Sequence, residues 1–160
     1  MDGGSDATRD SLATRRLRTW IRILGVTRAT EASLRSYLRE THATTLPRFD
    51  VLAALWRRGE PMPMGELSRM LLVSNGNATD VVGRLEAEGL VARSPCATDR
   101  RTVRVSLTEA GRAAFAGMAE GHRAELSRLF AALDESDLDA LRDILRKLAP
   151  RAGDKARERT

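Results

Sequence analysis

The side chains of this sequence that could do chemistry are amides, hydroxyls and guanidinium groups, concentrated in residues 67–107. Ser74, Asn75, Asn77 and Thr79 stand at the start of an expected helix, where free backbone N–H groups and the helix dipole favour phosphate. Asparagine can pair bidentately with adenine, and threonine can touch a thymine methyl. The pattern therefore predicts contact with DNA. For Ser74 or Asn75 the alternative role is capping of the helix.

Two charged side chains lie further along this helix. Arg84, on its outer side, either contacts phosphate or is a solvated surface arginine. Asp80 repels phosphate, although its carboxylate can accept a hydrogen bond from cytosine N4.

A basic hairpin follows the helix. Residues 90–105 contain Arg93, Arg100, Arg101 and Arg104 against a single acidic residue, Asp99. An arginine that enters a narrow A·T minor groove reads groove width more than bases, and Asp99 can hold one arginine by a charge-assisted pair. A solvated basic turn is the alternative interpretation.

Other chemistries find little support. His42 and His122 are far apart, with no cysteine or carboxylate at ligand spacing, so no metal is expected. Without a nucleophile–base arrangement or a glycine-rich phosphate loop, neither an enzyme nor a cofactor is predicted. The single cysteine, Cys96, cannot form an internal disulfide, which fits a reducing compartment. A redox switch at Cys96, activated by Arg93 and Arg100, is the alternative to an incidental thiol.

The candidate DNA contacts require a helix-turn-helix followed by two strands. The spacing of apolar residues predicts these helices and strands. The expected elements are helices from Pro47 to Gly59, 64–72 and 76–88, and strands 90–93 and 102–107. A threonine of Thr44-Thr45 is expected to cap the first helix, and Leu67, Met70 and Leu71 are expected inside. The predicted fold class is mainly α with a small β-wing, a winged helix-turn-helix with flanking dimerisation helices.

Long amphipathic helices are expected on both sides of this lobe, over residues 11–41, 108–133 and 134–150. The first is about 45 Å long, more than a lobe of this size needs. Apolar stripes at both chain ends predict a homodimer across a two-fold axis; a monomer with folded-back helices is the alternative. The predicted organisation is one chain of residues 1–160, with a DNA-binding lobe at 45–108, dimerisation helices at 11–44 and 109–150, and loose tails at 1–10 and 151–160.

The composition agrees with these predictions. The chain has 160 residues and a formal charge of +5, and a basic balance permits phosphate contact. No apolar run reaches membrane-spanning length and the first residues lack the apolar core of a signal peptide, so a cytoplasmic protein is expected.

The ordered combination of motifs resembles the MarR family of bacterial regulators. The pattern L-x-x-x-L-x-V-S-x-x-x-A-T-x-x-V-x-R-L-E-x-x-G-L-V, then D-R-R and V-x-L-T-x-x-G, lies between Met64 and Gly111. The resemblance covers nearly the whole chain, because the flanking helices match in length and order. It implies a homodimer on double-stranded DNA with a palindromic operator, recognition helices in successive major grooves and wings in the minor groove. It further implies that Asp99 holds the wing while Arg101 inserts, and that a small ligand usually releases a repressor.

Two segments, TTLPRFDVLAAL and MGELSRMLLVSNGNATDVVGRLEAEGLV, are similar to a branch that responds to aromatic acids. The resemblance implies a small aromatic acid, such as a hydroxycinnamate, or its CoA thioester as the effector. Two positions depart from the family pattern. Gly83 replaces the usual acidic residue, and Asp80 adds a carboxylate to the recognition helix, so the operator sequence stays open.

In this architecture an effector is expected between the first helix, the Pro47 helix and the recognition lobe. The residues expected to line that crevice are Trp20, Ile23, Leu24, Thr27, Arg48, Phe49, Leu52 and Trp56. The alternative is that most of the apolar members belong to the core. A further hypothesis, a winged helix retained as a protein-interaction module, is disfavoured by the basic wing.

Overall fold

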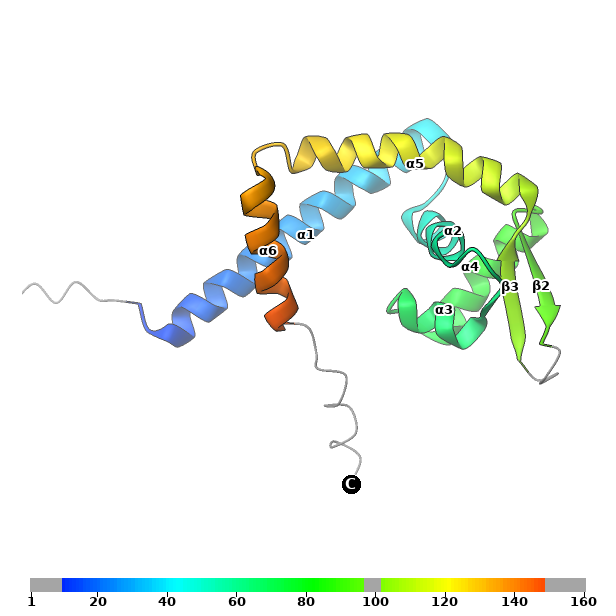
Figure 1. Cartoon of the computed structure of the whole chain (residues 1–160), viewed down its shortest axis with the longest axis horizontal. Coiled ribbons are helices and arrows are strands. Elements are labelled where there is room, and N and C mark those ends of the chain that lie inside the picture. The colour runs from blue at the N-terminus through cyan, green and yellow to red at the C-terminus, as the bar shows by residue number, and fades with distance from the viewer. Residues whose placement is uncertain (1–9, 97–101, 149–160) are drawn as a thin grey trace, which may run out of the picture. The chain divides into compact units, whose positions relative to one another are not determined.

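A computed structural model describes residues 10–96 and 102–148. Its elements are α1 (Leu12–His42), α2 (Leu46–Arg58), β1 (Met62–Pro63), α3 (Met64–Met70), α4 (Asn75–Ala87), β2 (Val91–Pro95), β3 (Val103–Leu107), α5 (Glu109–Leu129) and α6 (Glu135–Leu148) (Figure 1). The predicted fold class, mainly α with a small β-wing, is confirmed. The chain divides into two compact units, residues 1–126 and 127–160.

The sheet of the first unit has three antiparallel strands in the order β1-β3-β2. Met62 pairs with Val105, and Val91 pairs with Leu107. The sequence predicted only two strands, so β1 was missed. Two residues beside prolines carry no alternating pattern, and Pro63 is tolerated because β1 is an edge strand.

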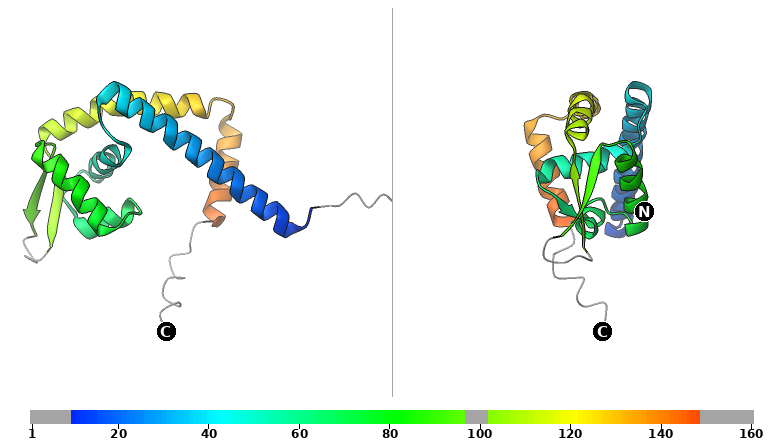
Figure 2. Two further views of the ribbon diagram at one scale, coloured as in Figure 1. Left: turned by 180° about the vertical axis from the view of Figure 1, so that it is seen from behind. Right: turned by 90° about the vertical axis from the view of Figure 1, so that its right-hand side faces the viewer.

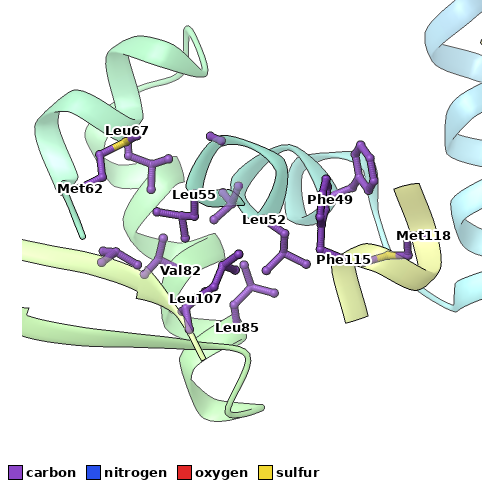
Figure 3. Packing of buried hydrophobic residues seen from close by; sticks show 14 of the residues in the cluster. Phe49, Leu52, Leu55, Met62, Leu67, Val82, Leu85, Leu107, Phe115 and Met118 are labelled. Atoms are coloured by element: carbon purple, nitrogen blue, oxygen red, sulfur yellow. The ribbon is translucent and has the colours of Figure 1, made fainter. Parts of the chain in front are cut away.

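The core of this unit gathers α2, α3, α4, the sheet and the first half of α5 (Figure 3). Leu52, Leu67, Leu85 and Val105 are almost completely buried, and each large apolar side chain so buried contributes about 1.5–3 kcal/mol. Met70 corrects the prediction, because its side chain is 42 % exposed. Met70 is the last residue of α3, so no further helical turn packs beside its side chain.

Three predicted helix starts have the expected caps. Ser74 Oγ accepts the N–H of Asn77 at 3.2 Å, and Thr108 Oγ1 accepts the N–H of Gly111 at 3.0 Å. Asp134 Oδ1 accepts the N–H of Asp137 at 2.9 Å. Each cap satisfies an N–H that has no partner within its helix.

The start of α2 differs from the prediction. Thr45 precedes the helix, but its side chain makes no capping hydrogen bond. Its carbonyl instead accepts the N–H groups of Arg48 and Phe49 at 3.1 Å. Pro47 in the first turn favours the helix because its backbone torsion is already helical.

The end of α5 also differs, since the helix stops at Leu129 and not at residue 133. The N–H of Leu133 bonds to the carbonyl of Phe130 at 3.0 Å, which is a turn leading to α6. The apolar spacing continues through this turn, so the sequence pattern gave no sign of the break.

Apolar side chains are exposed along much of α1 and along α6. In α1 the buried residues are Leu34 and Leu38, and its N-terminal part runs away from the winged lobe (Figure 2). The exposed apolar residues of α1 are Leu12, Leu17, Trp20, Ile21 and Val26. No residue of α6 is buried, and Leu138, Leu141, Ile144, Leu145 and Leu148 are exposed. Within residues 10–96 and 102–148, no helix is long and apolar enough to cross a membrane.

Candidate nucleic-acid interface

Helix α4 presents a polar outward face. Ala78, Val82 and Leu85 are buried, and Val82 and Leu85 pack in the core (Figure 3). Helical periodicity places Thr79 and Gly83 on the opposite side. The side chains predicted to contact DNA, namely Asn75, Asn77, Thr79, Asp80 and Arg84, are all exposed.

Hydrogen bonds within the chain hold the start of α4. Ser74 caps the helix, so the capping alternative is confirmed for that residue. The Thr79 hydroxyl donates to the Asn75 carbonyl at 2.8 Å, which leaves the threonine methyl as the group for an apolar contact. These local bonds hold the helix start in one conformation, where its free N–H groups favour an anion.

The wing is described up to the base of its loop. There the N–H of Cys96 donates to the carbonyl of Thr102 at 2.9 Å, and Cys96 is partly buried. Asp99, Arg100 and Arg101 lie outside the described residues, so their roles stay predictions.

Two arginines of the hairpin make contacts that the sequence did not predict. Arg104 donates to the Pro61 carbonyl from Nε at 3.1 Å and from Nη2 at 2.6 Å, which ties β3 to the start of β1. Arg93 reaches from β2 to α4, donating from Nη2 to the Thr79 carbonyl at 3.1 Å. Their acceptors are backbone carbonyls distant in sequence, for which no residue pattern exists.

The residues expected around an effector lie in different surroundings. Phe49 and Leu52 are core residues, 5 % and 1 % exposed. Trp20 lies on the exposed half of α1, with Ile23 and Leu24 partly buried nearby. The remaining members are Thr27, which donates to the Ile23 carbonyl at 2.9 Å, Trp56, whose ring centroid is 5.2 Å from that of Phe115, and Arg48.

Arg48 forms a two-pronged ion pair with Glu88. Its Nη1 donates to Oε1 at 2.7 Å, and Nη2 donates to Oε2. The hydrogen bonds from Arg48 lower the pKa of Glu88. Arg48 Nε is buried and has no hydrogen-bond partner among the described residues. The pair thus joins the start of α2 to the end of α4, with one buried donor left over.

A cavity of about 310 Å³ lies beside this ion pair. Its lining residues are His42, Ala43, Thr44, Arg48, Leu52, Leu85, Glu88, Leu90, Ala114 and Met118. The sequence predicted only Arg48 and Leu52 among them, since the others come from α1, α4, α5 and the segments that follow α1 and α4. The lining combines apolar side chains with the polar or charged residues His42, Thr44, Arg48 and Glu88, and the Arg48 guanidinium is the group that could attract a small organic anion.

A second cavity of about 310 Å³ lies between α2 and α4, lined by Asp50, Val51, Asn77 and Arg84 among others. Burial raises the pKa of Asp50, and the charge of Glu31 raises it further. Three of the predicted DNA contacts, Asn77, Asp80 and Arg84, therefore line this cavity.

A histidine lies in the packing between α2 and α5. The His122 ring stacks on Phe49 with centroids 4.2 Å apart, and burial lowers the pKa of the imidazole. In the part of the chain that the structure describes, no group of three or more His, Cys, Asp or Glu could hold a metal.

The three-stranded winged lobe, with its capped recognition helix and polar outward face, defines a winged helix-turn-helix DNA-binding protein. A profile of the MarR family matches residues 44–103. The transcriptional repressor MdtR of Bacillus subtilis is 30 % identical over 113 residues, 71 % of this chain and 72 % of MdtR. The regulator MhqR of the same organism is 27 % identical over 107 residues, 67 % of this chain and 73 % of MhqR.

Among solved structures, a cysteine-to-serine mutant of MarR from E. coli, complexed with operator DNA, has a TM-score of 0.76 at 26 % identity. It covers 88 % of this chain and 100 % of the MarR chain. The chain belongs to the MarR family of DNA-binding transcriptional regulators. These regulators are not enzymes, in agreement with the expectation from the sequence.

Proposed function

We propose that this protein is a homodimeric repressor that binds a palindromic operator and is released by a small aromatic acid or its CoA thioester. The observation that carries the proposal is the capped helix α4, whose polar side chains are exposed while its apolar side is fixed in the core. In this role Asn77 and Thr79 contact bases or phosphates in the major groove, and Arg84 contacts phosphate. Arg101 enters the minor groove, held by Asp99.

The exposed apolar residues support a dimer. Five large apolar side chains of α1 and five of α6 are exposed in one chain. Such stretches usually mark an interface, and a second copy related by a two-fold axis would cover the same stretches on both subunits. Two recognition helices placed in this way read two half-sites about one helical turn apart.

The Arg48–Glu88 cavity is the effector site that the geometry supports best. The carboxylate of an effector can replace Glu88 as the partner of the Arg48 guanidinium. The Glu88 side chain is 49 % exposed and can return to water. The buried Nε of Arg48 offers a further donor. Because Glu88 is the residue that ends α4, such an exchange changes how the recognition helix is attached to α2.

Release from DNA then follows from differential affinity. An effector that binds more tightly to the state without the Arg48–Glu88 pair weakens DNA binding. The loss of DNA affinity cannot exceed the ratio of the effector's affinities for the two states. Glu88→Gln frees Arg48 of its charged partner, so we expect tighter binding of an aromatic acid. Arg48→Met removes the guanidinium, so we expect weaker binding.

The test begins with duplexes selected from a random library by the purified full-length chain. The proposal expects palindromic sequences, a dimer by sedimentation equilibrium and salt-sensitive binding. A thermal-shift panel of aromatic acids and their CoA thioesters then identifies the effector, since a bound ligand raises the melting temperature. A monomer, or a dimer released by none of these compounds, contradicts the corresponding part of the proposal.

Two alternatives are separated by simple measurements. A redox switch requires Cys96, whereas a ligand-released repressor responds identically when Cys96→Ser is introduced. A protein-interaction module without DNA function shows no salt-sensitive affinity for any selected duplex.

A further inference from the structure

Gly83 lies on the outward face of α4, and an arginine from the wing covers it. An ideal Cβ at Gly83 would have Arg93 Nη2 as its nearest neighbour, at 3.5 Å. The guanidinium thus lies over a position where the helix offers no side chain. Since Thr79 and Asp80 share this outward face, a positive charge is added to the side of α4 that faces away from the core.

Three contacts hold Arg93 in this place. Its backbone N–H donates to Glu86 Oε1 at 3.2 Å, and its Nε lies 3.5 Å from Glu86 Oε2. Its Nη2 donates to the Thr79 carbonyl at 3.1 Å. The side chain is 31 % exposed, and Nη1 has no hydrogen-bond partner in residues 10–96 and 102–148. The guanidinium is therefore oriented while N–H donors remain available.

Arg93 lies where the sugar-phosphate backbone of a bound duplex would pass. Strand β2 follows α4 and leads to the wing loop. In the proposed complex α4 lies in the major groove and the wing in the adjacent minor groove, and a sugar-phosphate backbone separates these two grooves. A cation between the helix and the base of the wing faces that backbone.

We propose that Arg93 is a DNA-contacting residue, whose guanidinium binds a backbone phosphate between the two grooves. The proposal rests on the DNA-binding function above. A guanidinium presents paired N–H donors to phosphate oxygens, and the bonds to Thr79 and Glu86 remove much of the ordering cost. The charge also offsets the repulsion between phosphate and Asp80.

Gly83 is the residue that keeps this guanidinium available. Glu86 occupies only the Nε edge of Arg93. A carboxylate at position 83 would start from a Cβ 3.5 Å from Nη2 and would compete with phosphate for the same donors. Alanine at this position makes only an ordinary van der Waals contact and brings no charge.

The test measures duplex affinity against salt concentration for the unmodified chain, four single variants and the double variant Arg93→Met with Gly83→Asp. Arg93→Met removes the charge and keeps the apolar stem, whereas Arg93→Lys keeps the charge and loses the paired donors. Gly83→Asp supplies a competing carboxylate, with Gly83→Ala as its matched control. The probe is one duplex selected by the unmodified chain, and thermal unfolding checks that each variant is folded.

We expect Arg93→Met to lower affinity about ten-fold or more and to reduce the salt slope by roughly one per recognition helix. Arg93→Lys should retain the slope with intermediate affinity. In affinity and salt slope, Gly83→Asp should resemble Arg93→Met, and Gly83→Ala should resemble the unmodified chain. Gly83→Asp should have a much smaller effect on affinity when Arg93→Met is already present.

Each of three other results would overturn one part of the proposal. An unchanged salt slope in Arg93→Met would make Arg93 a brace between β2 and α4 and overturn the proposal. An equal effect of Gly83→Asp in both backgrounds would assign it to direct repulsion of phosphate and overturn the role given to Gly83. Absence of salt-sensitive binding by the unmodified chain would overturn the DNA-binding function itself, a distinguishable failure.

Discussion

The guanidinium of Arg48 in the first turn of α2 and the carboxylate of Glu88 after the last turn of α4 form an ion pair across 40 residues of sequence. The pair borders a cavity that also touches α1 and α5. A ligand in that cavity can therefore reach the Arg48–Glu88 ion pair at the end of α4, the recognition helix. The start of the helix is held separately by the Ser74 cap.

Glu88→Gln should lower the free energy of unfolding at pH 7 by less than about 1 kcal/mol, because both partners are partly exposed to solvent. The pKa of Glu88 is below its usual value of 4.5. The stability contributed by the pair is therefore complete above pH 4.5 and is lost as the pH falls toward the folded-state pKa. Urea unfolding of both chains at pH 7 and at acidic pH checks this. A difference that grows on acidification would contradict it.

Gly111→Ala should destabilise the winged lobe by about 1–3 kcal/mol or more. An ideal Cβ at Gly111 would lie 1.9 Å from the Leu90 carbonyl oxygen, so α5 and the start of β2 must separate. Gly117→Ala on the same helix is the matched control, with no atom within 4 Å of its Cβ. It should stabilise by about 0.5–1 kcal/mol. Equal melting temperatures for the two variants would disprove the close approach.

Ser74→Ala should cost about 1 kcal/mol of stability, because the N–H of Asn77 loses its acceptor. Operator affinity should fall with it. Ser74→Asp should restore the cap and the melting temperature but not the affinity, since a carboxylate at this end of α4 repels phosphate. Thermal unfolding and fluorescence anisotropy on the same samples separate these effects, and full recovery of affinity in Ser74→Asp would argue against a phosphate here.

His122→Phe should flatten the stability profile between neutral and mildly acidic pH. Burial holds the pKa of His122 below its usual 6.5, so the folded state binds its proton less readily than the unfolded state does. The stability associated with the neutral ring is complete above pH 6.5 and is lost as the pH falls toward the folded-state pKa. Phenylalanine preserves stacking on Phe49 without titrating. An unaltered pH profile of unfolding in the variant would refute this assignment.

Arg101→Ala should reduce operator affinity strongly without loss of the dimer, because it removes the arginine proposed to enter the minor groove. Arg57→Ala, an exposed arginine near the end of α2, serves as the control for loss of one positive charge. A gel-shift series at fixed salt and sedimentation equilibrium provide the two measurements. Binding equal to that of the control variant would remove Arg101 from the interface.

The winged fold was predictable because its signals are local. Apolar residues recurring at helical spacing, the caps at Ser74, Thr108 and Asp134, and the alternation along β3 each depend on a few neighbouring residues. The same local signals failed at β1, whose pairing partner lies on a distant strand, and at the end of α5, where apolar spacing ran on through a turn.

The candidate site likewise has features that local sequence predicts and contacts that only the fold determines. The amino-acid sequence by itself determined which side chains of α4 are polar, and its periodicity determined which of them face outward. Only the tertiary structure decided that Arg93 binds the Thr79 carbonyl, that Arg48 binds Glu88 and that Arg104 binds the Pro61 carbonyl. These contacts join residues 14, 40 and 43 positions apart, and packing of the core brings them together. Periodicity within one helix or strand carries no information about such pairs.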